Sequence, residues 1–239
     1  MAFSFFWHQC HLYRQKTLLL LVVLLCGQAV VAQKNRGNLN LPDYDDKQLH
    51  YGFLLGVNLN RYQIYNTPQY ASNEYLLNPK FTPGFSLGLV ATYQFSEYFG
   101  LRFSPQASFN ERVLEFTNLQ TGEVAERRIE STIVDFPLLI KLKAQRRGNT
   151  RAYLLAGIKP SIALGVRKVE EANLVRAENF DVAVEYGLGI DRFFQMFKFA
   201  PEIRISHGLR NIFIPDDNPF SNQIDRLYNH SISIYFFFE

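Results

Sequence analysis

The chain has 239 residues, of which 47% are hydrophobic and 20% charged, and its formal net charge is +3. This length allows a sizeable core within one domain, and the near balance of charge excludes the strongly basic footprint of a nucleic-acid-binding protein. Both cysteines, Cys10 and Cys26, lie in a segment predicted to be removed, which excludes disulfides, thiol nucleophiles and thiolate metal sites in the remainder.

The beginning of the chain has the features of a secretory signal peptide over residues 1–32. Arg14 and Lys16 precede a short apolar run, and Ala32 suits the small-residue rule for cleavage before Gln33. A retained membrane anchor is the rival interpretation, but the apolar run is short for a helix that needs about 20 residues to span a bilayer. Cleavage leaves 23 basic and 22 acidic residues, a net charge of +1.

Residues 33–48, QKNRGNLNLPDYDDKQ, form a polar leader that contains a proline. Such a composition favours an extended segment without a core of its own. We therefore expect a periplasmic leader between the signal peptide and a folded domain at 49–239.

Eight segments of the remaining chain alternate apolar and polar residues, which is the pattern of β-strands. Each is close to the nine to eleven residues that a tilted membrane strand requires. The segments are 50–60, 83–95, 100–109, 131–143, 151–165, 180–191, 197–206 and 229–239. They predict an all-β fold, an eight-stranded antiparallel up-and-down transmembrane β-barrel of the outer-membrane type.

The predicted connections alternate in length, which is the rhythm of an outer-membrane barrel with both termini on the periplasmic side. The long connections are 61–82, 110–130, 166–179 and 207–226, and the short ones are 96–98, 145–150 and 192–196.

One face of these strands is apolar, and the other is small and polar with a few charges of both signs. A soluble barrel with an apolar interior would instead show a densely charged outer face. We therefore expect the apolar face to meet lipid and the polar face to fill a narrow lumen. The terminal aromatics of the last strand resemble the signal read by the outer-membrane barrel-assembly machinery.

Four prolines fall inside predicted strands, where each removes a donor from the hydrogen-bond ladder. We expect β-bulges at these positions, so the strand registers around them stay open: Pro105, Pro137, Pro160 and Pro201.

Catalytic and metal-binding patterns are weak in this sequence. Ser206-His207 and His230-Ser231 are neighbours, but adjacent strand residues point to opposite faces and cannot form a dyad. His50, His207 and His230 are predicted on three distant strands, so no metal site is expected, and no cofactor or small-molecule substrate either.

Two groups of charged residues are candidate sites. The first is a lumen charge network whose members neutralise one another, with a polar path or gate as the alternative: Arg102, Asp135, Lys141, Glu185, Asp191, Glu202 and Arg204. The second is a periplasmic turn that would dock an acidic partner, with a plain solvated turn as the alternative: Arg146, Arg147 and Arg151.

Three segments resemble the PorT family, outer-membrane β-barrels of the type IX secretion system. The most specific pieces are the leader LPDYDDKQLHYGF, the strand DFPLLIK at 135–141, and FAPEIRISHGLRN at 199–211. The resemblance implies a component needed for the export of proteins with carboxy-terminal signal domains. It implies no catalytic residues.

We therefore expect a non-enzymatic protein of the outer membrane that acts through contacts with other secretion-system subunits. The alternative is a surface-interaction or adhesion barrel that works through its long loops. A lipid-modifying enzyme is the third and weakest hypothesis.

Overall fold

The computed structural model describes residues 39–66, 75–118, 124–164, 176–215 and 224–239. The predicted signal peptide and its cleavage position lie outside the described residues. No helix in the described part of the chain is long and apolar enough to cross a membrane.

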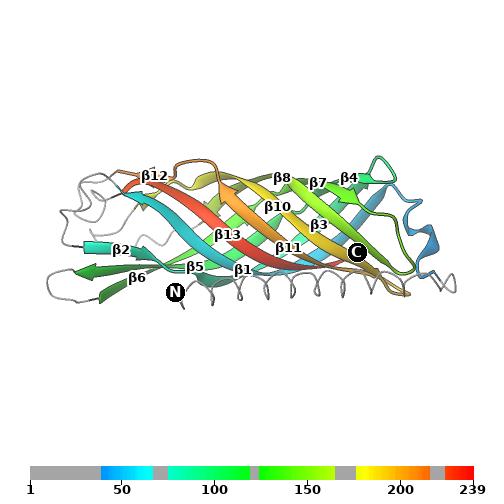
Figure 1. Ribbon diagram of the computed structural model, residues 1–239, viewed down its shortest axis with the longest axis horizontal. Helices are drawn as coiled ribbons and strands as arrows, with labels where there is room; N and C mark the ends of the chain where they lie inside the picture. The colour runs from blue at the N-terminus through cyan, green and yellow to red at the C-terminus, as the bar shows by residue number, and fades with distance from the viewer. Residues whose placement is uncertain (1–38, 67–74, 119–123, 165–175, 216–223) are drawn as a thin grey trace, which may run out of the picture. The chain divides into compact units, whose positions relative to one another are not determined.

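Eight strands wind around a closed ring (Figure 1). Neighbours around the ring are β1, β3, β4, β7, β8, β10, β11 and β13, and the pairing of β10 with β8 closes the sheet. Every pairing is antiparallel, which confirms the predicted fold class. The bounds of these strands are β1 (Leu49–Asn66), β3 (Thr82–Gln94), β4 (Phe99–Phe103), β7 (Leu138–Lys143), β8 (Thr150–Leu164), β10 (Phe180–Phe193), β11 (Lys198–Gly208) and β13 (Ile224–Phe238).

Two of the eight predicted strands are each divided at a proline. β4 continues beyond Pro105 as β5 (Gln106–Asn118), and β6 (Val124–Asp135) continues beyond Pro137 as β7. β5 and β6 replace β4 and β7 in the wall toward the other end of the ring, where they pair with β3 and β8.

The prediction of β-bulges at the prolines is wrong for this part of the wall. The strand pairings keep the same register on both sides of Pro105, Pro137 and Pro160. This holds where β4 and then β5 pair with β3, where β4 pairs with β7 and β5 with β6, and where β7 and then β6 pair with β8. Each proline instead accepts a hydrogen bond through its carbonyl, from Leu89, Ser104 and Phe136 respectively. Proline has no N–H with which to donate a hydrogen bond back to its partner. Each of these three neighbouring pairs therefore keeps only the hydrogen bond to the proline carbonyl, and we call the three pairs the proline seam.

The ring has a short-turn end, with connections at 95–98, 144–149 and 194–197, and a long-loop end. At the long-loop end, β5 and β6 stay paired as far as Thr117 and Val124, well beyond the ring. β2 (Tyr75–Pro79) pairs with β5 there, and Figure 1 shows these three strands projecting together. β9 (Arg176–Ala177) and β12 (Phe213–Ile214) form a separate two-stranded sheet. The segments predicted as long loops therefore contain much additional strand.

Side chains alternate between the two faces as the sequence pattern predicts. Apolar residues of the outer face are widely exposed on the strands, for example Leu89 at 65% and Leu188 at 56%. Phe53, Phe238 and Phe199 form an aromatic row on the outside of β1, β13 and β11, with ring centroids 4.9 and 5.2 Å apart. Such a continuous apolar outer surface suits contact with lipid.

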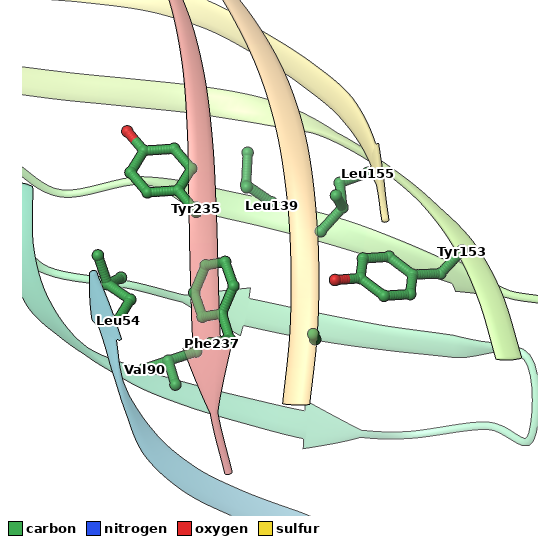
Figure 2. Close-up of a cluster of buried hydrophobic side chains, with 8 residues drawn as sticks. Leu54, Val90, Leu139, Tyr153, Leu155, Tyr235 and Phe237 are labelled. Atoms are coloured by element: carbon green, nitrogen blue, oxygen red, sulfur yellow. The ribbon is translucent and has the colours of Figure 1, made fainter. Parts of the chain in front are cut away.

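The inner face contains a small apolar core within an otherwise polar lumen. Tyr235 and Phe237 of β13 project inward against residues of the opposite wall (Figure 2). This core comprises Leu54, Val90, Leu139, Tyr153, Leu155, Ala200, Tyr235 and Phe237. The ring is therefore filled by side chains, as expected for a barrel of eight strands.

Candidate functional site: the ion-paired lumen and its leader cap

Two tyrosines occupy the lumen because glycines stand opposite them in the register. Gly56 faces Tyr235 across the β1–β13 pair, and Gly189 faces Tyr153 across the β10–β8 pair. A Cβ at either glycine would lie 2.5 Å from the facing tyrosine ring. The Gly189 position thus has a packing role.

The lumen charges begin with a cluster around Glu202 of β11. Its carboxylate accepts a hydrogen bond from the Tyr153 hydroxyl at 2.6 Å and pairs with Arg102 at 2.7 Å. Arg204 pairs with Glu202 and, at 3.3 Å, with Glu185. Burying these charges is tolerated because each of them is paired with an opposite charge.

A second cluster surrounds Asp191 of β10. Lys141 Nζ lies 2.9 Å and 3.1 Å from its two carboxylate oxygens, Arg151 Nε lies 3.2 Å away, and Lys198 Nζ 3.7 Å away. Three cations thus converge on one carboxylate that is fully buried.

Glu239, which follows the last residue of β13, joins the two clusters. One carboxylate oxygen lies 2.8 Å from Arg102 Nη2, and the other lies 2.8 Å from Lys198 Nζ. Burial by itself raises the pKa of Glu239, but the positive charges of Lys198 and Arg102 lower it by more, so that the pKa falls from 4.5 to about 2. We call the resulting connected series the ion-pair chain: Glu185, Arg204, Glu202, Arg102, Glu239, Lys198, Asp191, Lys141, Arg151 and Asp45.

Six of the seven residues proposed for the lumen network belong to this chain. The seventh, Asp135, is buried elsewhere, where it accepts hydrogen bonds from Ser108 and Ser161, both at 2.6 Å. Sequence reasoning left out Glu239, although it has the inward parity of the predicted strand 229–239, and it left out Asp45, which belongs to the leader and to no predicted strand.

The leader folds back over the short-turn end of the ring, so the prediction of an extended segment is wrong for residues 40–48. Leu41 adopts a left-handed backbone conformation and is followed by a single 3-10 turn, η2 (Pro42–Tyr44). The Tyr44 ring stacks on His50 at 3.9 Å and meets Phe193 edge-on at 5.4 Å.

The Tyr44 hydroxyl ties the leader to the ion-pair chain. It accepts a hydrogen bond from Lys198 at 2.7 Å and donates one to Glu239 at 3.0 Å. Burial, and next the Glu239 carboxylate, raise the pKa of Tyr44, so this hydroxyl stays neutral. Asp45, one residue further on, pairs with Arg151 at 2.7 Å. We call residues 40–45 the leader cap.

The three arginines proposed as a docking turn separate into three different environments. Arg151 is 5% exposed and turned into the lumen, so its prediction as a docking residue is wrong. Arg146 lies over the Phe193 ring at 3.7 Å and donates to the carbonyls of Asn40 and Leu41. Arg147 is exposed to solvent. Arg151 points inward because it shares the inward parity of β8 with Tyr153 and Leu155.

A polar chamber lies in the lumen toward the long-loop end. It has a volume of about 40 Å³ and is lined mainly by asparagine and serine side chains, with Lys159, Asp135 and Asp181. Since one water needs roughly 10–15 Å³ of such volume, the chamber has room for about three waters. It is too small for a folded or extended polypeptide.

The comparison with known protein families agrees with this architecture. A family model described as "Outer membrane protein beta-barrel domain" matches residues 31–214. Among solved structures, OprG from Pseudomonas aeruginosa aligns with a TM-score of 0.45 and 8% identity, over 79% of this chain and 92% of that one. Ail, the attachment invasion locus protein of Yersinia pestis, aligns with a TM-score of 0.36 and 13% identity, over 80% and 98%.

One curated protein also matches part of the chain. It is a 5-formaminoimidazole-4-carboxamide-1-(beta)-D-ribofuranosyl 5'-monophosphate synthetase from Saccharolobus solfataricus, 31% identical over 85 residues. The match spans 36% of this chain and only 24% of the synthetase.

Proposed function

The chain belongs to the outer-membrane protein β-barrel domain family, and from that premise we propose that it is a non-enzymatic component of the type IX secretion system. In this proposal it supports the export of proteins with carboxy-terminal signal domains through protein contacts, and cargo does not pass through it. Both termini of the barrel lie on the periplasmic side, and residues 1–32 are a signal peptide removed during export.

The observation that carries the proposal is the leader cap. A lumen filled by an apolar core and an ion-pair chain is built for rigidity and not for transport of a polypeptide. The short-turn end, by contrast, presents a defined surface, because Arg146 and Arg151 hold the leader in one conformation. A periplasmic partner subunit would meet the leader cap together with the exposed Arg147.

The resemblance to the PorT family adds support at the same place. The quoted leader motif LPDYDDKQLHYGF includes most of the cap and the start of β1. Those residues form the leader cap and begin the first strand of the ring.

The test begins with a deletion strain, whose culture supernatant and periplasm are profiled for cargo with carboxy-terminal signal domains. We expect this cargo to accumulate in the periplasm and to be restored by the wild-type gene. Unchanged export would remove the secretion proposal and leave the barrel as described.

The same strain then tests the docking surface by complementation. Arg147→Glu should impair export at normal barrel levels, whereas Arg226→Glu, an exposed arginine on β13 near the long-loop end, should not. Equal export by both variants would show that Arg147 is not part of the contact.

A second candidate function, surface interaction, is favoured by the projecting strands β2, β5 and β6. Excision of residues 112–129, with an Asn-Gly turn joining the paired residues Glu111 and Glu130, removes the projecting parts of β5 and β6 and with them the partner of β2. Normal export with loss of attachment to surfaces or host cells would favour this candidate over the secretion role.

A further inference from the structure

Two histidines that are far apart in the sequence meet on the outer face near the long-loop end. His207 of β11 and His230 of β13 are direct partners in the antiparallel register. Their Nδ1 atoms lie 3.0 Å apart, and their ring centroids lie 4.5 Å apart. The prediction that the histidines occupy distant strands is therefore wrong for this pair.

At this distance the two Nδ1 atoms cannot both point a lone pair at each other, because two lone pairs repel. Either one proton or one metal ion must lie between them. Tyr186 of the neighbouring strand β10 bears on the choice, because its hydroxyl lies 3.0 Å from His207 Nε2. When Nε2–H donates to the Tyr186 oxygen, Nδ1 of His207 carries the lone pair that faces His230.

We propose that His207 and His230 form a binding site for a divalent transition-metal ion of the imidazole-preferring class, such as Zn²⁺ or Ni²⁺. Imidazole nitrogens bind Zn²⁺ at about 2.0–2.1 Å. Two such nitrogens in adjacent coordination positions therefore lie roughly 2.9–3.4 Å apart, which the Nδ1 separation matches. Imidazole is a favoured ligand of Zn, Ni and Cu.

Tyr186 would act as a positioning residue for this site. Metal-binding histidines commonly donate their second ring N–H to an oxygen, which fixes the tautomer and the ring orientation. Both histidines also stand on paired strands of the closed ring, so the two nitrogens are held in place before a metal arrives.

The site offers two protein ligands, and water completes the coordination. Within the described ranges, no group of three His, Cys, Asp or Glu side chains is gathered for a metal. We therefore expect an affinity in the micromolar range. Arg61, the partner of His230 on β1, opposes the binding of a cation, although its guanidinium lies over the Phe81 ring at 5.3 Å.

The experiment is calorimetric titration of tag-free barrel, refolded in detergent micelles, with ZnCl₂ and with NiCl₂. We expect one ion per barrel, and His207→Gln or His230→Gln should each weaken binding at least tenfold. Tyr186→Phe should weaken it by roughly tenfold. His50→Gln, which changes the histidine beneath the leader cap, should leave the affinity unchanged. Retention of the fold is checked by the mobility of unheated samples on gels.

The direction in which Arg61→Gln changes binding separates a metal site from the alternative, a site for a phosphate anion. Removal of a nearby positive charge should tighten metal binding, whereas a site for a phosphate anion would lose its ligand and bind phosphate less. Absence of saturable metal binding by the wild-type barrel would overturn the proposal, as would equal binding by His207→Gln. Loss of phosphate binding in Arg61→Gln, without any metal binding by the wild type, would identify an anion site instead.

Discussion

At the scale of single residues, the interior depends on how each buried charge finds its partners. Glu239 contacts Arg102, Lys198 and Tyr44 at once, so it connects two strands of the ring and the leader. Removing one member of such a group leaves other buried charges without compensation, which is more costly than the loss of a surface ion pair.

Glu239→Gln should therefore lower the free energy of unfolding by about 3 kcal/mol near neutral pH. Because the pKa of Glu239 is lowered from 4.5 to about 2, its contribution is complete above about pH 4.5 and is lost as the pH falls through 2. The difference between wild type and variant should shrink over that interval.

Urea unfolding in micelles, followed by far-UV circular dichroism, measures this difference at several pH values. Tryptophan fluorescence does not serve, since Trp7 is the single tryptophan and lies in the predicted signal peptide. Asp225→Asn, in an exposed ion pair with Arg226, is the control and should change stability by less than about 1 kcal/mol. A loss for Glu239→Gln of the same size at pH 2 and pH 7 would contradict the assignment.

Gly189→Ala should destabilise the barrel by about 1–3 kcal/mol, because the new Cβ displaces the Tyr153 ring from its place in the lumen. The cost should fall in a Tyr153→Leu background, and the double-mutant cycle isolates that coupling. Gly100→Ala, where the nearest atom to a new Cβ is 3.2 Å away, is the milder control. Equal costs in both backgrounds would show that the glycine serves some other purpose.

The sequence predicted which residues face inward but not which of them pair. Alternation places Arg102, Glu202 and Asp191 inside, because parity is a local property of each strand. Pairing depends on the tilt of the strands and on the leader, which brings Asp45 and Tyr44 to the short-turn end of the lumen from outside the alternating pattern. No local signal in the leader predicts that contact.

At the scale of elements, the leader cap shows how a polar segment is fixed without a core of its own. Arg146→Ser removes the donors to Asn40 and Leu41 and the contact with Phe193, so it should loosen residues 40–47. Limited trypsin digestion at Lys47 should then be several-fold faster than in the wild type. Arg147→Ser is the matched control, and equal acceleration in that variant would count against the cap as described.

Strand extent was the less predictable part of the elements. The eight ring strands follow from alternation, whereas the continuation of β5 and β6 beyond the ring was assigned to a loop. A short connection that contains Gly122 is a hairpin signal of the longer-loop kind, and it pointed to this continuation. The β-bulges predicted at the proline seam were wrong for a different reason. A proline removes one hydrogen bond of the ladder, but the residues on either side of it still fix the register of the strand.

At the scale of the whole molecule, the filled ring predicts a barrel that does not conduct. In planar lipid bilayers we expect no unitary current steps from the purified protein, in contrast to wide porins whose lumen holds water. Arg146→Ser should also stay closed, because the ion-pair chain and the apolar core lie behind the cap. Discrete steps in the wild type would instead support the polar-path interpretation of the lumen charges.

The position of the leader cap has a consequence for the order of assembly. Tyr44 and Asp45 bind a surface made by β1, β8, β10, β11 and Glu239, and this surface exists only once β13 has joined β1 to β11. An early part of the chain therefore waits for a late one before it can fold. Protection of the leader from a protease would accordingly mark the moment at which a newly inserted barrel is sealed.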